Sequence, residues 1–314
     1  MNKHLFYTLV WLAMACPAVA QQLPLLSQLQ ESVGVLNPAA LSSSYLYFGN
    51  DFRIGATYHG QWTQIEGGPR TSQLVVETVF EDYSPITPLA GAYLITDQTG
   101  PTGFSGLYAK VGGILSDDPA TRGVSIALQA GVNQYRLRFD ELQLRDPEAV
   151  LASGDDGRIF PDVGLGIFAY ETVGDNVFYA GLSAPQVLGL NFSFRGADGR
   201  VETQRYAHYY AQAGAILRLR DEAFLEPTAW VKHVPNLPTN ITASLRYQSS
   251  TALYVGLGGS SSRTIHAEGG VVLGDRSYGG RYFRIGYGFD YAFRRYGPYA
   301  GGTHEINLTY AFDR

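Results

Sequence analysis

Apolar and polar side chains alternate along most of this chain with a period of two residues. Between Phe283 and Phe293 every second residue is aromatic or Ile, whereas the residues between them are small or charged. Successive side chains of a β-strand point to opposite faces, so such a segment forms a strand with one apolar and one polar face. The same alternation recurs at residues 52–59, 240–247 and 305–312. Helical periodicity is nearly absent, and the pattern predicts an all-β protein.

Turn residues divide the chain into about fourteen alternating segments. Gly, Pro, Asn, Asp and Ser gather between the apolar runs, as at residues 97–103 and 235–238. Most segments have the roughly 9–11 residues of a tilted membrane-spanning strand. We expect strands near residues 52–61, 70–80, 86–96, 103–115, 120–138, 158–171, 176–183, 204–218, 222–232, 237–248, 251–261, 264–274, 280–292 and 302–312.

The first twenty residues have the pattern of a secretory signal peptide. An apolar run at residues 5–16 follows the positive charge of Lys3, and Ala18 and Ala20 complete a small-x-small cleavage site. We therefore expect cleavage after Ala20. The alternative is lipid modification of Cys16, whose neighbours fit that signal poorly. Because Cys16 is the only cysteine, no disulfide would stabilise the mature chain.

Alternation alone would also fit a soluble β-sandwich or propeller, but further features of the sequence favour a membrane barrel. The chain has 37 Gly, 22 Tyr and 16 Phe, and only 16% of its residues are charged. After the signal, no apolar stretch reaches the roughly 18–20 residues of a membrane-spanning helix, so strands would have to cross the membrane. Tyrosines gather at strand ends, as in the aromatic girdles of outer-membrane barrels. The net charge of −5 disfavours nucleic acid as a partner.

The lengths of the connections also fit a transmembrane antiparallel outer-membrane β-barrel. With both termini in the periplasm, the connections from odd to even strands face the outside, where the long loops of such barrels lie. The longest connections all follow odd strands; they are residues 61–69, 140–157, 184–203 and 293–301.

The segment between the signal and the first strand does not alternate. It is rich in Leu, contains Pro24 and Pro38, and has three consecutive serines at 42–44. We expect it to enter or cap the periplasmic mouth. The predicted organisation is a signal peptide at 1–20, an N-terminal lead-in or periplasmic plug segment at 21–50, and a β-barrel at 51–314.

Charged residues on the polar faces of the strands are expected to form ion pairs that fill or line the lumen; a substrate path is the alternative. These lumen charges are Arg53, Arg246, Glu268, Arg284, Asp290 and Glu305. An acidic stretch at 140–156 lacks the spacing of a calcium loop, so we interpret it as a solvated loop.

No set of residues supports catalysis. His304 and Glu305 are adjacent in a predicted strand, so their side chains leave opposite faces and cannot form a dyad. No Ser or Asp can be matched to an oriented His. We therefore predict a protein that is not an enzyme, with no cofactor and no metal.

Two clusters near the start of the chain contain no catalytic or metal-binding pattern, and we interpret them as structural features. They are Asn37, Pro38 and Ala39, and then Gln61, Trp62, Gly67, Gly68, Pro69, Arg70 and Thr71. The glycines and the proline of the second cluster shape a turn. Trp62 has two interpretations, as an interfacial anchor or as part of an outer recognition surface.

Together with later blocks, these clusters resemble the PorP/SprF family of Bacteroidota outer-membrane proteins. The later blocks lie at 178–185, 226–232, 286–291 and 303–306. The blocks cover essentially the whole mature chain in the family's order. Ser42 stands where the family usually has an aromatic residue and then Gly, and His59 stands where it usually has Arg, which indicates a divergent member.

The resemblance implies a barrel component of the type IX secretion system and, in some members, of gliding motility. Such proteins bind or anchor secreted proteins that carry a C-terminal sorting domain, and they meet outer-membrane lipids and other secretion or periplasmic envelope components. The family-motif or partner-binding candidates are Asn37, Pro38, Gln61, Trp62, Gly68, Pro69, Thr71, His304 and Glu305. The alternative is an outer-membrane transport channel for small or hydrophobic compounds.

Overall fold

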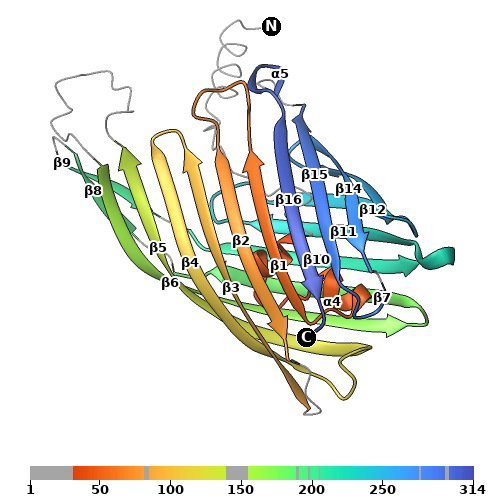
Figure 1. Ribbon diagram of the computed structural model, residues 1–314. Coiled ribbons are helices and arrows are strands. Elements are labelled where there is room, and N and C mark those ends of the chain that lie inside the picture. The colour runs from red at the N-terminus through yellow and green to blue at the C-terminus, as the bar shows by residue number, and fades with distance from the viewer. Residues whose placement is uncertain are drawn as a thin grey trace, which may run out of the picture.

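The structure is a computed structural model that describes residues 31–80, 85–138, 155–188, 191–196, 199–204, 206–275, 277–293 and 297–314. Fourteen antiparallel strands close into one barrel, in which β1 pairs with β16 (Figure 1). This confirms the predicted fold class and strand number. The predicted signal peptide, its cleavage after Ala20, residues 21–30 of the lead-in and residues 140–154 of the acidic loop lie outside the described residues.

The barrel strands follow the predicted segments closely. They are β1 (Phe52–Gly60), β2 (Arg70–Val79), β3 (Ile86–Thr99), β4 (Thr102–Leu115), β5 (Arg122–Arg138), β6 (Asp155–Val173), β7 (Asn176–Gln186), β10 (His208–Arg218), β11 (Phe224–His233), β12 (Asn240–Gln248), β13 (Leu253–Ser260), β14 (Thr264–Gly274), β15 (Tyr282–Ala292) and β16 (Thr303–Phe312). The connection expected at 184–203 contains a hairpin of β8 (Asn191–Gly196) and β9 (Gly199–Gln204).

Short helices complete the fold. They are α3 (Val33–Leu36), α4 (Ser43–Phe48), α5 (Gly297–Ala300) and the 3-10 turn η3 (Arg220–Glu222). Within the described part of the chain, no helix has both the length and the hydropathy to span a membrane.

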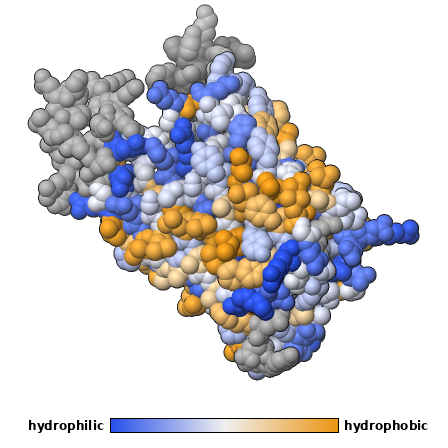
Figure 2. Space-filling model, viewed as in Figure 1, coloured by the Kyte–Doolittle hydropathy of each residue, from blue (hydrophilic) through white to orange (hydrophobic). Residues whose placement is uncertain are grey.

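The two faces of the wall differ as the alternation predicts. On β15, Phe283, Ile285 and Tyr287 are exposed, whereas Arg284 between them is buried. Exposed apolar side chains cover the outer surface, where they would meet lipid. Figure 2 shows these hydrophobic side chains gathered over the strands, with hydrophilic ones toward the ends of the molecule.

The two ends of the barrel are unlike. We call the end at which β1 begins and β16 ends the terminal end, and the opposite end the loop end. The terminal end has short turns, such as the one at Gly174 between β6 and β7, whose φ of 62° suits glycine. The wall is also uneven, because β5 and β6 have 17 and 19 residues whereas β12 and β13 have nine and eight.

The core of the molecule is formed by residues 31–50, here called the lumen segment, which lie inside the barrel. Every residue of this segment is buried except Tyr45 and Leu46, which are half-buried. Leu36 and Leu41 belong to an apolar cluster with Phe168 and Trp230 of the wall. A second cluster joins α4 to the wall; it contains Tyr47, Phe48, Phe224 and Tyr282. The lumen segment therefore fills the part of the lumen that these wall residues surround.

Candidate functional site

Glu31, at the start of the lumen segment, is the centre of a buried network of ion pairs. Its carboxylate accepts hydrogen bonds from Arg246 Nη1 at 3.0 Å, from Arg284 Nη1 and from Thr309 Oγ1 at 3.4 Å. Its backbone carbonyl accepts a further bond from Arg53 Nη1. These partners lie on β12, β15, β16 and β1. One residue of the lumen segment thus joins four strands of the wall.

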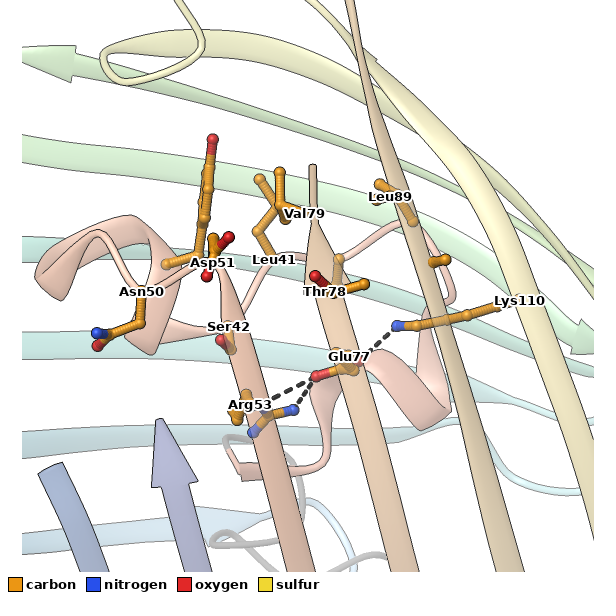
Figure 3. Close-up of a pocket in the computed structure, with 13 residues that line it drawn as sticks. Leu41, Ser42, Asn50, Asp51, Arg53, Glu77, Thr78, Val79, Leu89 and Lys110 are labelled. Carbon is orange, nitrogen blue, oxygen red and sulfur yellow. Dashed lines mark hydrogen bonds and ion pairs between the residues drawn. The ribbon is translucent and has the colours of Figure 1, made fainter. Parts of the chain in front are cut away.

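The arginines also bind carboxylates of neighbouring strands. Arg246 donates to Glu226 Oε2 from Nη2 at 2.5 Å and from Nε at 3.1 Å. Arg53 pairs with Glu77, which also accepts a bond from Lys110 Nζ at 2.5 Å (Figure 3). Each charged side chain of this network contacts one of opposite charge. Such pairing is needed because an unpaired charge is costly to bury.

The electrostatic surroundings keep Glu31 ionised. Burial alone would raise the pKa of its carboxyl group, but Arg284, Arg246 and Arg53 together hold the pKa at about 2. The space left beside Arg53 and Glu77 is small, with a cavity of about 30 Å³ (Figure 3). That volume suits a water molecule rather than a substrate.

Asn37 and its neighbours dock on a part of the wall made by two glycines. Asn37 Nδ2 donates to the carbonyl of Ile167 on β6 at 3.2 Å, and its Oδ1 accepts a bond from the Ala39 amide at 3.1 Å. A β-carbon on Gly166 would lie 2.0 Å from Asn37 Oδ1, and one on Gly181 would lie 2.7 Å from Asn37 Nδ2. Glycine at both positions gives the side chain its room.

This contact unites two of the sequence blocks. Gly181 belongs to the block at 178–185, and from the same block Ser183 Oγ donates to the carbonyl of Leu36 at 2.8 Å. Pro38 also packs here, since its Cδ would lie 3.1 Å from a β-carbon on Gly166. The Asn-Pro-Ala cluster and the later block are therefore the two halves of one docking contact between the lumen segment and the wall.

At the loop end, the second cluster forms a closed loop between β1 and β2. The Gln61 amide donates to the Pro69 carbonyl at 2.8 Å, and the Gly68 amide donates to the Ile65 carbonyl at 3.0 Å. A β-carbon on Gly68 would lie only 2.5 Å from the Gln61 carbonyl oxygen. Trp62 has a positive φ of 53° and is half-buried. The glycine permits the turn, as expected.

Neighbouring connections hold this loop in place. The Gly100 amide, in the turn between β3 and β4, donates to the Gly67 carbonyl at 2.9 Å. Thr63 and Gln64 donate from their amides to the carbonyls of Gly302 and Ala300 at 3.2 and 3.1 Å. We call residues 61–69, 100–101 and 297–302 the loop-end cluster. Two of its apolar side chains are open to solvent; they are Ile65, 45% exposed, and Tyr299, 79% exposed.

Thr71 links β2, the first strand after this loop, to β3, because its Oγ1 donates to Asp97 Oδ2 at 2.7 Å.

His304 and Glu305 lie on opposite faces of β16. Glu305 is buried in the lumen with its Oε2 3.3 Å from His59 Nδ1. His304 is half-buried on the outer face, and its Nδ1 lies 2.6 Å from the Tyr287 hydroxyl.

The structure buries each sequence-derived lumen charge inside the barrel. In addition to the arginines already described, Asp290 Oδ2 lies 2.8 Å from His266 Nδ1, and Glu268 is 7% exposed. Sequence reasoning missed Glu31, Glu77, Glu226 and Lys110. The last three stand at lumen-facing positions of their strands, so alternation could have found them, whereas Glu31 lies in a segment without periodicity. Within the described ranges, no group of His, Cys, Asp and Glu is arranged to hold a metal ion.

The chain matches the family described as "Type IX secretion system membrane protein PorP/SprF" over residues 18–310. It belongs to the PorP/SprF family. Family and barrel fold together place this PorP/SprF protein in the outer membrane, and membership implies that it works with other components of the type IX secretion system. No curated protein matches the chain.

Solved outer-membrane barrels share the fold of this PorP/SprF protein at low sequence identity. A TodX monoaromatic hydrocarbon channel mutant lacking S2 and S3 has a TM-score of 0.56 and 10% identity, and the match covers 90% of this chain and 94% of that one. The CymD monoaromatic hydrocarbon channel has a TM-score of 0.54 and 12% identity, with 90% and 92% covered. The translocator domain of the autotransporter NalP from Neisseria meningitidis has a TM-score of 0.52 and 15% identity, with 90% and 95% covered. At this identity the likeness concerns the fold alone.

Proposed function

We propose that this PorP/SprF protein is a non-enzymatic outer-membrane component of the type IX secretion system that binds or anchors secreted proteins at its loop end. These partners are proteins with a C-terminal sorting domain or surface adhesins, including adhesins that serve gliding motility. The observation that carries the proposal is that this barrel belongs to the PorP/SprF family and that its own residues 31–50 fill its lumen. Such a barrel presents a surface to a partner and leaves little path for a solute.

Orientation supports the loop end as the binding surface. Outer-membrane barrels have short periplasmic turns and longer external loops, so the loop end faces the outside. The loop-end cluster is held rigid by backbone bonds, and it exposes Ile65 and Tyr299. A rigid loop that exposes an aromatic side chain loses little conformational entropy on binding.

A transport channel for small or hydrophobic compounds is the second candidate, because two of the structural neighbours are hydrocarbon channels. The lumen segment argues against it. Three of the charges that would line a solute path, Arg53, Arg246 and Arg284, instead bind Glu31, and the cavity beside Arg53 and Glu77 has a volume of about 30 Å³. A channel function would require the lumen segment to leave.

Affinity capture tests the proposal. Wild-type protein is recovered from detergent-solubilised envelopes and the retained proteins are identified, beside a double variant, Ile65→Ser with Tyr299→Ala. The matched control is Tyr278→Ala, because Tyr278 is 69% exposed at the terminal end. We expect wild type and control to retain a sorting-domain protein and the double variant to retain about 10-fold less. Recovery of no sorting-domain protein and no secretion component would contradict the proposal.

A further inference from the structure

Glu268 of β14 is a buried carboxylate that takes no part in the hydrogen-bonded network around Glu31. It faces the lumen and is only 7% exposed. Among the residues that the structure describes, neither of its carboxylate oxygens accepts a hydrogen bond. Burial of a carboxylate without hydrogen bonds is costly, so packing alone does not account for this residue.

Glu268 lies beside an arginine that Glu31 binds. Arg246, Gly256 and Glu268 stand opposite one another on β12, β13 and β14. A β-carbon on Gly256 would lie 2.5 Å from Glu268 Oε1. The carboxylate therefore extends over Gly256 toward Arg246, and the residue between them contributes no side chain.

The two arginines of β12 and β15 lie close to each other. The guanidinium carbon of Arg246 is 5.7 Å from the centre of the Tyr254 ring, and that of Arg284 is 5.3 Å from it. Glu31 Oε1 accepts a hydrogen bond from both guanidinium groups. Within the described ranges, Nε and Nη2 of Arg284 make no hydrogen bond. This part of the wall thus has donors to spare as well as a spare carboxylate.

The charges of the wall balance here even without Glu31. Arg246 and Arg284 are the cations, and Glu226 and Glu268 are the carboxylates. Glu226 already accepts two hydrogen bonds from Arg246. With Glu31 removed, Glu268 can serve the remaining donors, so that no arginine is left as an uncompensated buried charge.

The lumen segment can move without opening the wall. The fourteen strands close into a ring that does not include it (Figure 1). The segment is joined to β1 through Gly49, which ends α4 with a φ of 71°, in the left-handed region that favours glycine. A rotation about Gly49 would carry Glu31 away from the arginines and leave every strand pair intact.

We propose that the lumen segment is a displaceable plug and that Glu268 is the reserve partner of the two arginines. The segment moves out about Gly49, and Glu268 takes the place that Glu31 leaves beside the guanidinium groups. The apolar clusters of Leu36, Leu41, Tyr47 and Phe48 with the wall favour the closed state, so the open state is a minor one. The barrel thereby contains a gate for its own lumen, which is independent of partner binding at the loop end.

Thiol labelling of the native full-length protein tests the gate. Val35→Cys places a thiol in the lumen segment, at a position that is 6% exposed in the closed state. A polyethylene-glycol maleimide is too bulky for the packed lumen, so it reacts when the segment has left. Mass spectrometry of the labelled peptide distinguishes this thiol from that of Cys16. We expect slow labelling, at a rate proportional to the population of the open state.

Glu268→Gln, made in the Val35→Cys protein, should slow this labelling. The amide keeps the shape of the side chain but carries no charge to compensate an arginine, so the open state is disfavoured. The closed state loses no hydrogen bond within the described part of the chain. We expect a rate about 10-fold lower, which corresponds to the loss of one hydrogen bond to a charged group.

Asp290→Asn is the matched control for this variant. Asp290 is also a buried carboxylate on the lumen face, but its Oδ2 lies 2.8 Å from His266 Nδ1. We expect the control to label at the rate of the Val35→Cys protein. Planar-bilayer recordings provide a second measurement, in which rare openings of the wild-type protein should become rarer in Glu268→Gln and stay as frequent in Asp290→Asn.

The direction of the change separates a reserve partner from a merely structural residue. Removal of a carboxylate that only stabilised the closed state would speed labelling, so an equal or faster rate in Glu268→Gln contradicts the inference. Resistance to heat in detergent shows whether the variants are folded. If Glu268→Gln does not fold, Glu268→Asp decides, because its shorter side chain reaches less far and should label more slowly than the parent protein. A thiol at position 35 that never reacts would show that the plug does not leave.

Discussion

The carboxylate of Glu31 accepts a hydrogen bond from Arg246 at 3.0 Å across 215 residues of chain. Arg246 belongs to β12 and Glu31 to a segment that precedes every strand. The same carboxylate also holds Arg284. Because removing one partner of a buried charge pair leaves the other uncompensated, this contact couples the lumen segment to the stability of the barrel.

Glu31→Gln should destabilise the protein by about 3–5 kcal/mol, since Arg246 and Arg284 would lose the charge between them. Thermal or denaturant unfolding in detergent measures the loss. Glu66→Gln is the control, because Glu66 is exposed in the loop between β1 and β2. Equal stabilities of the two variants would show that the network at Glu31 contributes nothing.

Lowering the pH should reduce the free energy of unfolding within a defined pH range, because Glu31 becomes protonated there. Its pKa is about 2 in the folded protein and 4.5 is its ordinary value, so the folded state favours the ionised form. A lowered pKa contributes stability that is complete above about pH 4.5 and is lost as the pH falls toward 2, with a total of about 3 kcal/mol. Unfolding free energies of wild type and Glu31→Gln, measured from pH 7 to pH 2.5, should therefore converge. A constant difference would refute this assignment.

Gly166→Ala should destabilise the protein by about 1–3 kcal/mol, because the new methyl group would overlap Asn37 Oδ1. Gly103→Ala is the matched control, since a β-carbon there meets only Arg136 Cβ at 3.8 Å. In a double-mutant cycle, Asn37→Ala should relieve part of the cost of Gly166→Ala. Additive effects would mean that the two residues do not interact.

Deletion of residues 22–48 should open the barrel. The wild-type protein in a planar bilayer should conduct few ions, because every residue of the lumen segment is buried except the half-buried Tyr45 and Leu46. A barrel of fourteen strands without this segment has room for an aqueous path. Single-channel recordings compare the two proteins, with circular dichroism to show that the strands are retained. Unchanged conductance would count against the plug.

Alternation along the chain was enough to predict the number of strands and the direction of their side chains. Tyr282 to Ala292 of β15 show why, since each residue's face depends only on its position in the strand. The differences in length between the strands of the wall were harder to predict from the sequence. The end of the ladder at Pro185 depends on where β7 meets β6, and periodicity says nothing about that register.

The sequence by itself determined that this protein is a fourteen-stranded outer-membrane barrel of the PorP/SprF family, because strand periodicity is local and family blocks survive as short runs of residues. Only the tertiary structure decided that Glu31 neutralises Arg246 and Arg284, and that Asn37 lies against Gly166 and Gly181. These contacts join residues more than a hundred positions apart. Closure of the barrel around the lumen segment brings such residues together, and no pattern along the chain records it.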